Sequence, residues 1–167
     1  MKYFLLILLM STFAFAQTTQ TQQQQPNCSG PEFRQFDFWI GEWNVDQAGK
    51  PAGTSSIQLI LDKCVIFENW TGRGGYTGKS FNIYNRSLKQ WQQFWVDSTG
   101  TPIIFTGEYA NGSMRMQSEG KSAEGKRQIT RMTFTPVDAN RVRQLWEQSD
   151  DDGKTWQTLF DGNYVRK

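Results

Sequence analysis

The sequence predicts an all-β fold, a single antiparallel up-and-down β-barrel of about ten strands. Short apolar and aromatic runs follow one another from Phe36 to the C-terminus. Gly, Pro, Asn and Asp residues separate these runs at close intervals, and no long amphipathic helix interrupts them. Many short strands in meander order are typical of a closed barrel or a sandwich, and we favour the barrel.

Residues 1–16 have the pattern of a secretory signal peptide. Lys2 supplies the positive start, Phe4–Met10 the apolar core, and Ala14-Phe15-Ala16 a small-x-small cleavage site before Gln17. The apolar run is shorter than the roughly 20 residues that a membrane-spanning helix needs, although a retained anchor is the alternative. We therefore expect a secreted or periplasmic protein without a membrane span in the mature chain.

Residues 17–30 are expected to form a flexible tail, and residues 31–167 the barrel domain. Gln17 to Gln25 contains only Gln and Thr. Such a segment has no apolar side chain whose burial would offset its ordering entropy. The domain itself is expected to open with a turn or short helical piece from Pro31 to Gln35.

The two cysteines, Cys28 and Cys64, are predicted to form a disulfide. An exported chain meets an oxidising compartment, where a cysteine pair is usually joined. The alternative is a nucleophilic thiol, which needs a basic partner to form the thiolate. The chain contains no histidine, so this alternative is poor.

The predicted first strand, Phe36–Val45, carries four aromatic residues in ten positions. Gly41 would allow a bend or a tight passage there, and Trp39 and Trp43 would close one end of the barrel. Nine further strands are predicted from apolar alternation and turn signals. They are Ser55–Leu61, Cys64–Thr71, Lys79–Asn85, Gln90–Asp97, Ile103–Tyr109, Ser113–Ser118, Gln128–Thr135, Arg141–Ser149 and Thr155–Arg166.

Ser149–Trp156 matches the pattern S-x-D-x-G-x-T-W, which resembles the Asp-box of sialidase propellers. In those proteins it is a structural hairpin that recurs, whereas here it occurs once. The pattern therefore predicts a stable turn between the last two strands. Asp150-Asp151-Asp152 is also an acidic run of the kind that attracts calcium, but the turn accounts for the same residues, and no metal is predicted.

Composition excludes several classes of function. Removing residues 1–16 removes Lys2, their single charged residue, and lowers the formal net charge from +2 to +1. No basic face is visible, so nucleic-acid binding is not expected. Without histidine the chain has neither a Ser-His-Asp triad nor a histidine-ligated metal. Gly72-Arg73-Gly74-Gly75 lacks the following helix that phosphate-binding loops need, and no cofactor is predicted.

Gly41-Glu42-Trp43, the strand order and Arg166 in the last strand resemble the lipocalin-like (calycin) barrels. The resemblance implies structural roles for Gly41, Trp43 and Arg166, with Trp43 at the closed end of the barrel against the arginine. The longer pattern is similar to uncharacterised secreted bacterial lipocalin-like proteins. Its landmarks are Phe36–Val45, Cys64–Trp70, Trp95–Asp97, Arg143–Glu147 and Thr155–Arg166.

Strand alternation predicts which side chains share a face. If Tyr84 pairs with Trp91, then Asn82 lies opposite Gln93 and Ser80 opposite Trp95. Such a mixture of rings and amides is typical of a ligand pocket. The predicted ligand-binding residues are Trp70, Asn82, Tyr84, Gln93, Trp95, Arg131, Gln144 and Trp146. Two alternatives stay open, namely that these faces meet solvent or that their polar atoms satisfy one another in a core.

The first functional hypothesis is the binding of a small amphipathic or aromatic ligand without catalysis. The second is a cofactor-free acid–base enzyme of the lyase or isomerase type, using Glu68, Arg131 and Tyr84, with Glu147 and Asp97 as further acids. Against it, Glu68 and Glu147 are also placed to pair across strands with Arg131 or Arg143. The third is a cell-envelope module that docks a carbohydrate or protein on exposed aromatic residues.

Overall fold

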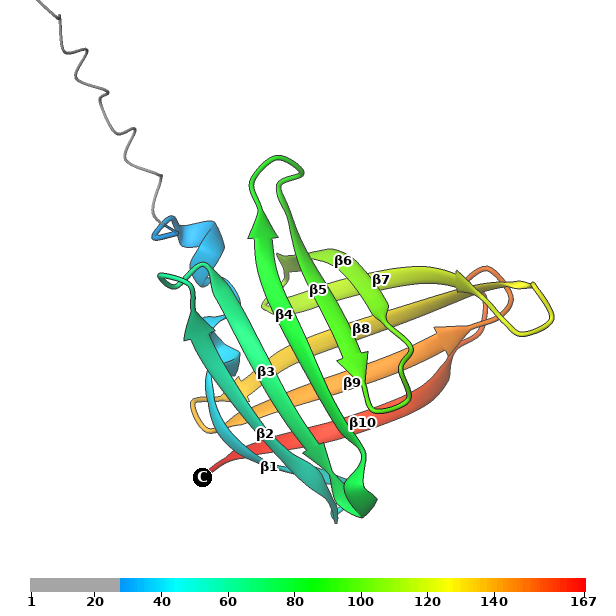
Figure 1. Ribbon diagram of the computed structural model, residues 1–167, viewed down its shortest axis with the longest axis horizontal. Helices are drawn as coiled ribbons and strands as arrows, with labels where there is room; N and C mark the ends of the chain where they lie inside the picture. Colours follow the sequence, from blue (N-terminus) through cyan, green and yellow to red (C-terminus); the bar gives the residue numbers. More distant parts are fainter. Residues whose placement is uncertain (1–27) are drawn as a thin grey trace, which may run out of the picture.

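A computed structural model describes residues 28–167 of the chain (Figure 1). The predicted signal peptide and residues 17–27 of the predicted tail lie outside the described residues. Ten strands form one closed antiparallel barrel, in which each strand pairs with its sequence neighbours and β10 returns to β1. The predicted fold class is confirmed.

The strands are β1 (Gly41–Gln47), β2 (Lys50–Ile60), β3 (Val65–Gly72), β4 (Thr77–Asn85), β5 (Gln90–Asp97), β6 (Ile103–Ala110), β7 (Ser113–Lys121), β8 (Arg127–Asp138), β9 (Arg141–Ser149) and β10 (Gln157–Arg166). Three short 3-10 helices accompany them, η1 (Pro31–Arg34), η2 (Asp37–Trp39) and η3 (Arg73–Gly75). The predicted bounds of the strands at 90–97 and 141–149 are confirmed. The helical piece expected at 31–35 is η1.

The segment before β1 folds into the barrel interior and fills one end of it. The prediction of a strand over Phe36–Val45 is therefore wrong in its first half, where η2 replaces it. The rings of Phe36 and Trp39 stack with centroids 5.0 Å apart, and both contact Phe134 of β8. Both side chains are fully buried. An extended strand would send alternate rings outward, whereas the 3-10 turn directs both rings into the interior.

Gly41, Trp43 and Arg166 join the first strand to the last. Trp43 pairs with Arg166 in register, and the guanidinium lies 4.3 Å from the centre of the buried Trp43 ring. Arg166 Nη1 also donates to the Ile40 carbonyl at 3.0 Å. Gly41 has a φ of 144°, and a Cβ there would lie 2.1 Å from Arg166 Nη1. Only glycine leaves room for this arginine.

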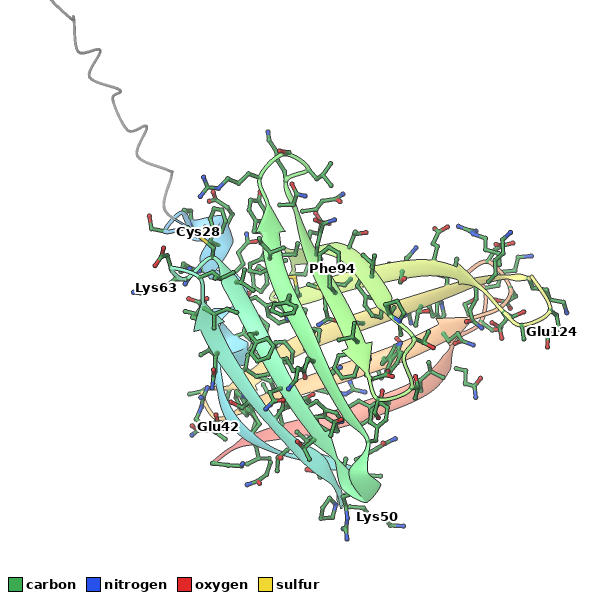
Figure 2. The ribbon with its side chains drawn as sticks, in the orientation of Figure 1. Cys28, Glu42, Lys50, Lys63, Phe94 and Glu124 are labelled. Carbon is green, nitrogen blue, oxygen red and sulfur yellow. A yellow bond between two sulfur atoms is a disulfide. The ribbon has the colours of Figure 1, made fainter. Side chains whose placement is uncertain are left out.

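The predicted disulfide is present and links Cys28 to Cys64. Cys64 ends the turn between β2 and β3, so the bond fastens the entry segment to the barrel wall. Figure 2 places Cys28 beside Lys63 of that turn, at the opposite end of the sheet from Lys50 of the β1–β2 hairpin. The covalent link and the buried aromatic rings therefore lie at the same end.

The β9–β10 connection has the hydrogen bonds expected of an Asp-box. Asp151 accepts from the amide and the hydroxyl of Thr155 at 2.8 and 2.7 Å. Ser149 Oγ accepts from the Gly153 amide at 2.8 Å, and Trp156 Nε1 donates to the Gly153 carbonyl at 3.0 Å. The sequence pattern is thus accounted for by the turn.

Two strands are longer than predicted, because β2 begins before Ser55 and β8 ends after Thr135. Pro51 lies within β2, which begins at Lys50, and Pro136 lies within β8. Each proline is next to a register shift, between Val45 and Asp46 of the partner strand in the first case and between Pro136 and Asp138 in the second. A bulge removes the need for a ladder hydrogen bond from proline, which is why a strand tolerates the residue there.

Replacing Trp43 tests the closed end of the barrel. We expect Trp43→Ala to lower the free energy of unfolding by about 3–5 kcal/mol, because it removes a buried ring and the surface on which Arg166 rests. Urea unfolding followed by circular dichroism measures this change. Leu88→Ala, at an exposed turn position, is the control and should change stability little. A wild-type midpoint for Trp43→Ala would contradict the assignment.

Removing the disulfide tests the tether of the entry segment. The bond closes a sequence separation of 36 residues. A loop of this length predicts a loss of about 2–4 kcal/mol in the Cys28→Ser/Cys64→Ser double variant, chiefly by freeing the unfolded chain. Thermal unfolding with and without reductant measures it. Reductant should lower the wild-type transition and leave that of the double variant unchanged.

Candidate functional site

A cavity of about 440 Å³ opens at the end of the barrel opposite the disulfide. The β1–β2 hairpin, the β3–β4 connection and the outer part of the β9–β10 hairpin surround its mouth. The lining residues are Gln47, Ala52, Glu68, Trp70, Gly72, Arg73, Tyr76, Gln93, Trp95, Phe105, Met132, Gln144, Trp146, Leu159, Phe160 and Tyr164. The interior is thus divided into an aromatic core at one end and a hollow at the other.

Two glycines help to keep the hollow open. A Cβ on Gly53 would lie 2.8 Å from the Trp70 ring, and a Cβ on Gly78 would lie 2.3 Å from the Trp95 ring. Because both positions lack a side chain, the two indoles lie against the backbone of the neighbouring strands. Larger residues there would push the rings toward the centre of the cavity.

Glu68 of β3 is a buried carboxyl group in the cavity wall. Its side chain is only 3% exposed. Ser55 Oγ of β2 donates to Oε1 at 3.2 Å, and Ser80 Oγ of β4 donates to Oε2 at 2.8 Å. Burial disfavours the charged form and raises the pKa of Glu68 to about 7, against the smaller opposite effect of the two serine hydrogen bonds.

A chain of hydrogen bonds runs from β5 across β4 to this carboxyl group. Gln93 Nε2 donates to Asn82 Oδ1 at 2.9 Å, and Asn82 Nδ2 donates to Ser80 Oγ at 2.9 Å. Ser80 in turn donates to Glu68. All donors of the chain therefore point toward Glu68. At the other end, Gln93 Oε1 is buried and has no hydrogen-bond partner among residues 28–167.

The opposite wall carries a second polar group among aromatic rings. The Tyr164 hydroxyl donates to Gln144 Oε1, and Gln144 Nε2 donates to the thioether of Met132. Burial, with the nearby charge of Glu68, raises the pKa of Tyr164 well above 10, so its hydroxyl stays protonated. Trp146 Nε1 is buried without a partner. This wall thus offers an unused donor, whereas the Glu68 side offers an unused acceptor.

At the mouth, Asp97 fixes two aromatic side chains. Its Oδ2 accepts from the Tyr76 hydroxyl at 2.8 Å and from Trp95 Nε1 at 2.9 Å. Against the effect of burial, hydrogen bonds from Thr99, Trp95 and Tyr76 lower the pKa of Asp97 to about 2. Burial and the hydrogen bond to Asp97 raise the pKa of Tyr76 to about 12. The Asp97 carboxylate therefore fixes the positions of Tyr76 and Trp95 at the mouth of the cavity.

The expected register between β4 and β5 is confirmed, with Tyr84 opposite Trp91 and Asn82 opposite Gln93. Five of the eight predicted ligand-binding residues line the cavity: Trp70, Gln93, Trp95, Gln144 and Trp146. Asn82 is fully buried and does not line the cavity, but its Oδ1 accepts a hydrogen bond from Gln93. Tyr84 lies at the closed end, against Phe33 and Trp91.

Arg131 faces the outside of the barrel and does not line this cavity. It donates to Glu147 through Nε at 2.7 Å and Nη2 at 3.1 Å, and it lies 3.8 Å from the centre of the Trp156 ring. Met132 and Phe134 belong to the hydrophobic core inside the barrel, so strand alternation directs Arg131 outward. The expected cross-strand pairing of Glu147 is therefore confirmed, whereas Glu68 has no arginine partner.

Sequence reasoning placed Glu68 among possible acids but not among the ligand-binding residues. It also missed Tyr164, Phe105 and Phe160, which line the cavity. The alternation Ile66-Glu68-Trp70 carried the signal for Glu68, because it places the carboxyl on the same face as a predicted pocket residue. The proposed catalytic set of Glu68, Arg131 and Tyr84 is not brought together by the fold.

The outer face of the barrel carries a row of apolar side chains. Phe67, Phe81, Phe94 and Ile104 are successive cross-strand neighbours from β3 to β6. Phe81, Phe94 and Ile104 are 45%, 40% and 52% exposed. Phe94 is labelled on β5 in Figure 2. An interaction module that docks its partner on exposed aromatic residues would need a surface of this kind.

Within residues 28–167, no group of three or more Cys, Asp or Glu side chains is placed to hold a metal ion. None of the helices formed by these residues is long and apolar enough to cross a membrane. No protein-family model matches the chain, and no curated protein matches it. The cavity is therefore the feature of this protein that points to a function.

The raised pKa of Glu68 makes stability depend on pH. Below pH 4.5, the ordinary pKa, the carboxyl group is protonated in both folded and unfolded chains. Between pH 4.5 and about 7 the unfolded chain releases this proton while the folded chain keeps it, so the free energy of unfolding falls as pH rises. Each pKa unit corresponds to about 1.4 kcal/mol, so the loss reaches about 3 kcal/mol by pH 8.

Glu68→Gln removes this dependence. We expect the variant to match the wild type near pH 4.5 and to exceed its stability by up to about 3 kcal/mol at pH 8. Urea unfolding at both pH values measures the difference. Glu147→Gln, which removes an outward carboxyl group, is the matched control and should retain the wild-type fall between the two pH values. Parallel pH curves for wild type and Glu68→Gln would refute the assignment.

Proposed function

We propose that this protein binds a small amphipathic or aromatic molecule in the cavity at the open end of its barrel. The observation that carries the proposal is a hollow of about 440 Å³ with aromatic walls and two buried, unpartnered polar atoms, Gln93 Oε1 and Trp146 Nε1. Ligand sites are typically about 300–1,000 Å³, mostly apolar, with a few polar groups that orient the ligand. A core that only stabilised the fold would be filled.

Export is part of the same proposal. We infer that residues 1–16 direct secretion or transfer to the periplasm, and that residues 31–167 of the mature protein form a lipocalin-like barrel. The Cys28–Cys64 disulfide supports an oxidising compartment. The approach of Arg166 to Trp43 supports the lipocalin-like assignment. No nucleic-acid partner is proposed.

Acid–base catalysis on the bound molecule is the second candidate. It is favoured by the pKa of Glu68, which at about 7 suits a group that gives and takes a proton near neutral pH. The two candidates differ in what happens to the bound molecule. A binding protein returns it unchanged, whereas an enzyme converts it and loses turnover in Glu68→Gln.

Blocking the cavity tests ligand binding. Ala52 lies at the mouth, and we expect Ala52→Trp to place an indole in the hollow. Prodan, a neutral naphthalene dye whose emission reports an apolar environment, should bind the wild type and quench its tryptophan fluorescence. We expect at least about tenfold weaker binding to Ala52→Trp, a loss of about 1.4 kcal/mol.

Thr54→Trp is the matched control, because Thr54 pairs with the exposed residues Asn44 and Thr71 on the outer face of the barrel. It should bind prodan as the wild type does. Native mass spectrometry of protein from its own source should also show an added mass that Ala52→Trp lacks. Equal binding of prodan by all three proteins would place its site outside the cavity and count against the proposal.

A further inference from the structure

Glu68 is a buried acid without a cation. The ion pairs formed within residues 28–167 all involve other carboxyl groups. Its donors are the two serine hydroxyls, and each carboxylate oxygen can accept a further hydrogen bond. An unpaired buried charge is costly, so structural carboxylates inside proteins normally have a cationic partner. Here the carboxyl group lines a cavity in which a cationic ligand could take the place of that partner.

The polar groups next to Glu68 have all their donors in use, and what they lack is a further hydrogen-bond donor. The amides of Asn82 and Gln93 and the hydroxyl of Ser80 already donate along the chain toward Glu68. What remains is Gln93 Oε1, an acceptor in a side chain that is 1% exposed and lines the cavity. Glu68 and Gln93 project from β3 and β5, the strands on either side of β4 (Figure 1). A ligand group with several donors would satisfy both.

The walls suit a positive charge. Aromatic faces attract cations, and proteins use cages of aromatic rings to recognise quaternary and methylated ammonium groups. Rings of Trp70, Trp95 and Tyr164 line the cavity together with Glu68. Of the lining residues, Arg73 carries a positive charge, and it lies exposed in η3 at the mouth. The interior therefore has an unpaired carboxyl group among aromatic side chains.

We propose that the cavity selects a protonated amine on an apolar or aromatic frame, whose ammonium group donates to Glu68 and to Gln93 Oε1. This inference rests on the proposed ligand-binding function and names the chemical class of its ligand. The ammonium ion brings three donors and the charge that the buried carboxylate lacks. The aromatic walls bury the remainder of the molecule.

Amine binding should strengthen as pH rises through about 7, because the amine binds the ionised form of Glu68. Tyr164 and Tyr76, which also line the cavity, stay neutral in this range, and Asp97 at the mouth stays ionised. With a pKa of about 7, affinity should rise about thirtyfold between pH 5.5 and pH 8.5. Below pH 7, binding should release a proton.

Three indoles with the same two-carbon arm test the proposal: tryptamine, tryptophol and indole-3-propionate, which end in an ammonium, a hydroxyl and a carboxylate. Isothermal titration calorimetry at pH 5.5 and 8.5 measures each affinity, and buffers of different ionisation enthalpy measure proton release. The wild type should bind tryptamine at pH 8.5 at least about tenfold tighter than tryptophol, a difference of about 1.4 kcal/mol. Indole-3-propionate should bind most weakly.

Glu68→Gln should abolish the preference for tryptamine and its pH dependence. Glu147→Gln, the outward control, should keep both. Equal binding of tryptamine and tryptophol would overturn the amine proposal, with ligand binding itself intact. Affinity that falls as pH rises through about 7 would also overturn it and would identify Glu68 as a proton donor to a neutral ligand. If prodan binds but tryptamine does not, the amine proposal alone fails. If neither binds, the proposed function fails as well.

Discussion

The pairing of β1 with β10 is the constraint on which the rest of the structure depends. It turns a meander into a closed barrel, so every strand must send alternate side chains into one interior. Arg166 fixes this seam by crossing Gly41 to reach the Ile40 carbonyl and the Trp43 ring. Because Ile40 follows η2, the same contact sets where the entry segment can go. It folds inside, and its rings take up one end of the available volume.

The cavity follows from this division of the interior. The entry segment supplies its rings at the disulfide end only, so inward side chains at the far end must fill the space alone. Two of the largest, Trp70 and Trp95, lie so close to Gly53 and Gly78 that a Cβ at either glycine would collide with the indole ring. Asp97 holds the Trp95 indole in that position through Nε1. Glycine normally weakens a strand, but Gly53 and Gly78 leave room for the two indoles at the wall and so help to keep the cavity open.

Much of this could be predicted from sequence, because the signals are local. Turn residues and alternation identified the strands, and the expected pairing of Tyr84 with Trp91 placed Asn82 opposite Gln93 correctly. Alternation does not say which face is inside, however. Arg131, predicted to bind the ligand, therefore lies on the outer face of the barrel instead. The fold of Phe36 and Trp39 depends on Phe134, nearly a hundred residues away, which no local pattern reveals.

The polar side of the cavity is where local rules and the fold disagree most. A glutamate, two serines, an asparagine and a glutamine face inward from β2 to β5, where a stable core would use aliphatic residues. Their hydrogen bonds explain Ser55, Ser80 and Asn82, since these support Glu68 and Gln93. They do not explain why Glu68 should be there, because a stabilising network would end on a group that is neutral or paired. Such inconsistencies are expected at functional sites, and this one lies where a ligand would complete the network.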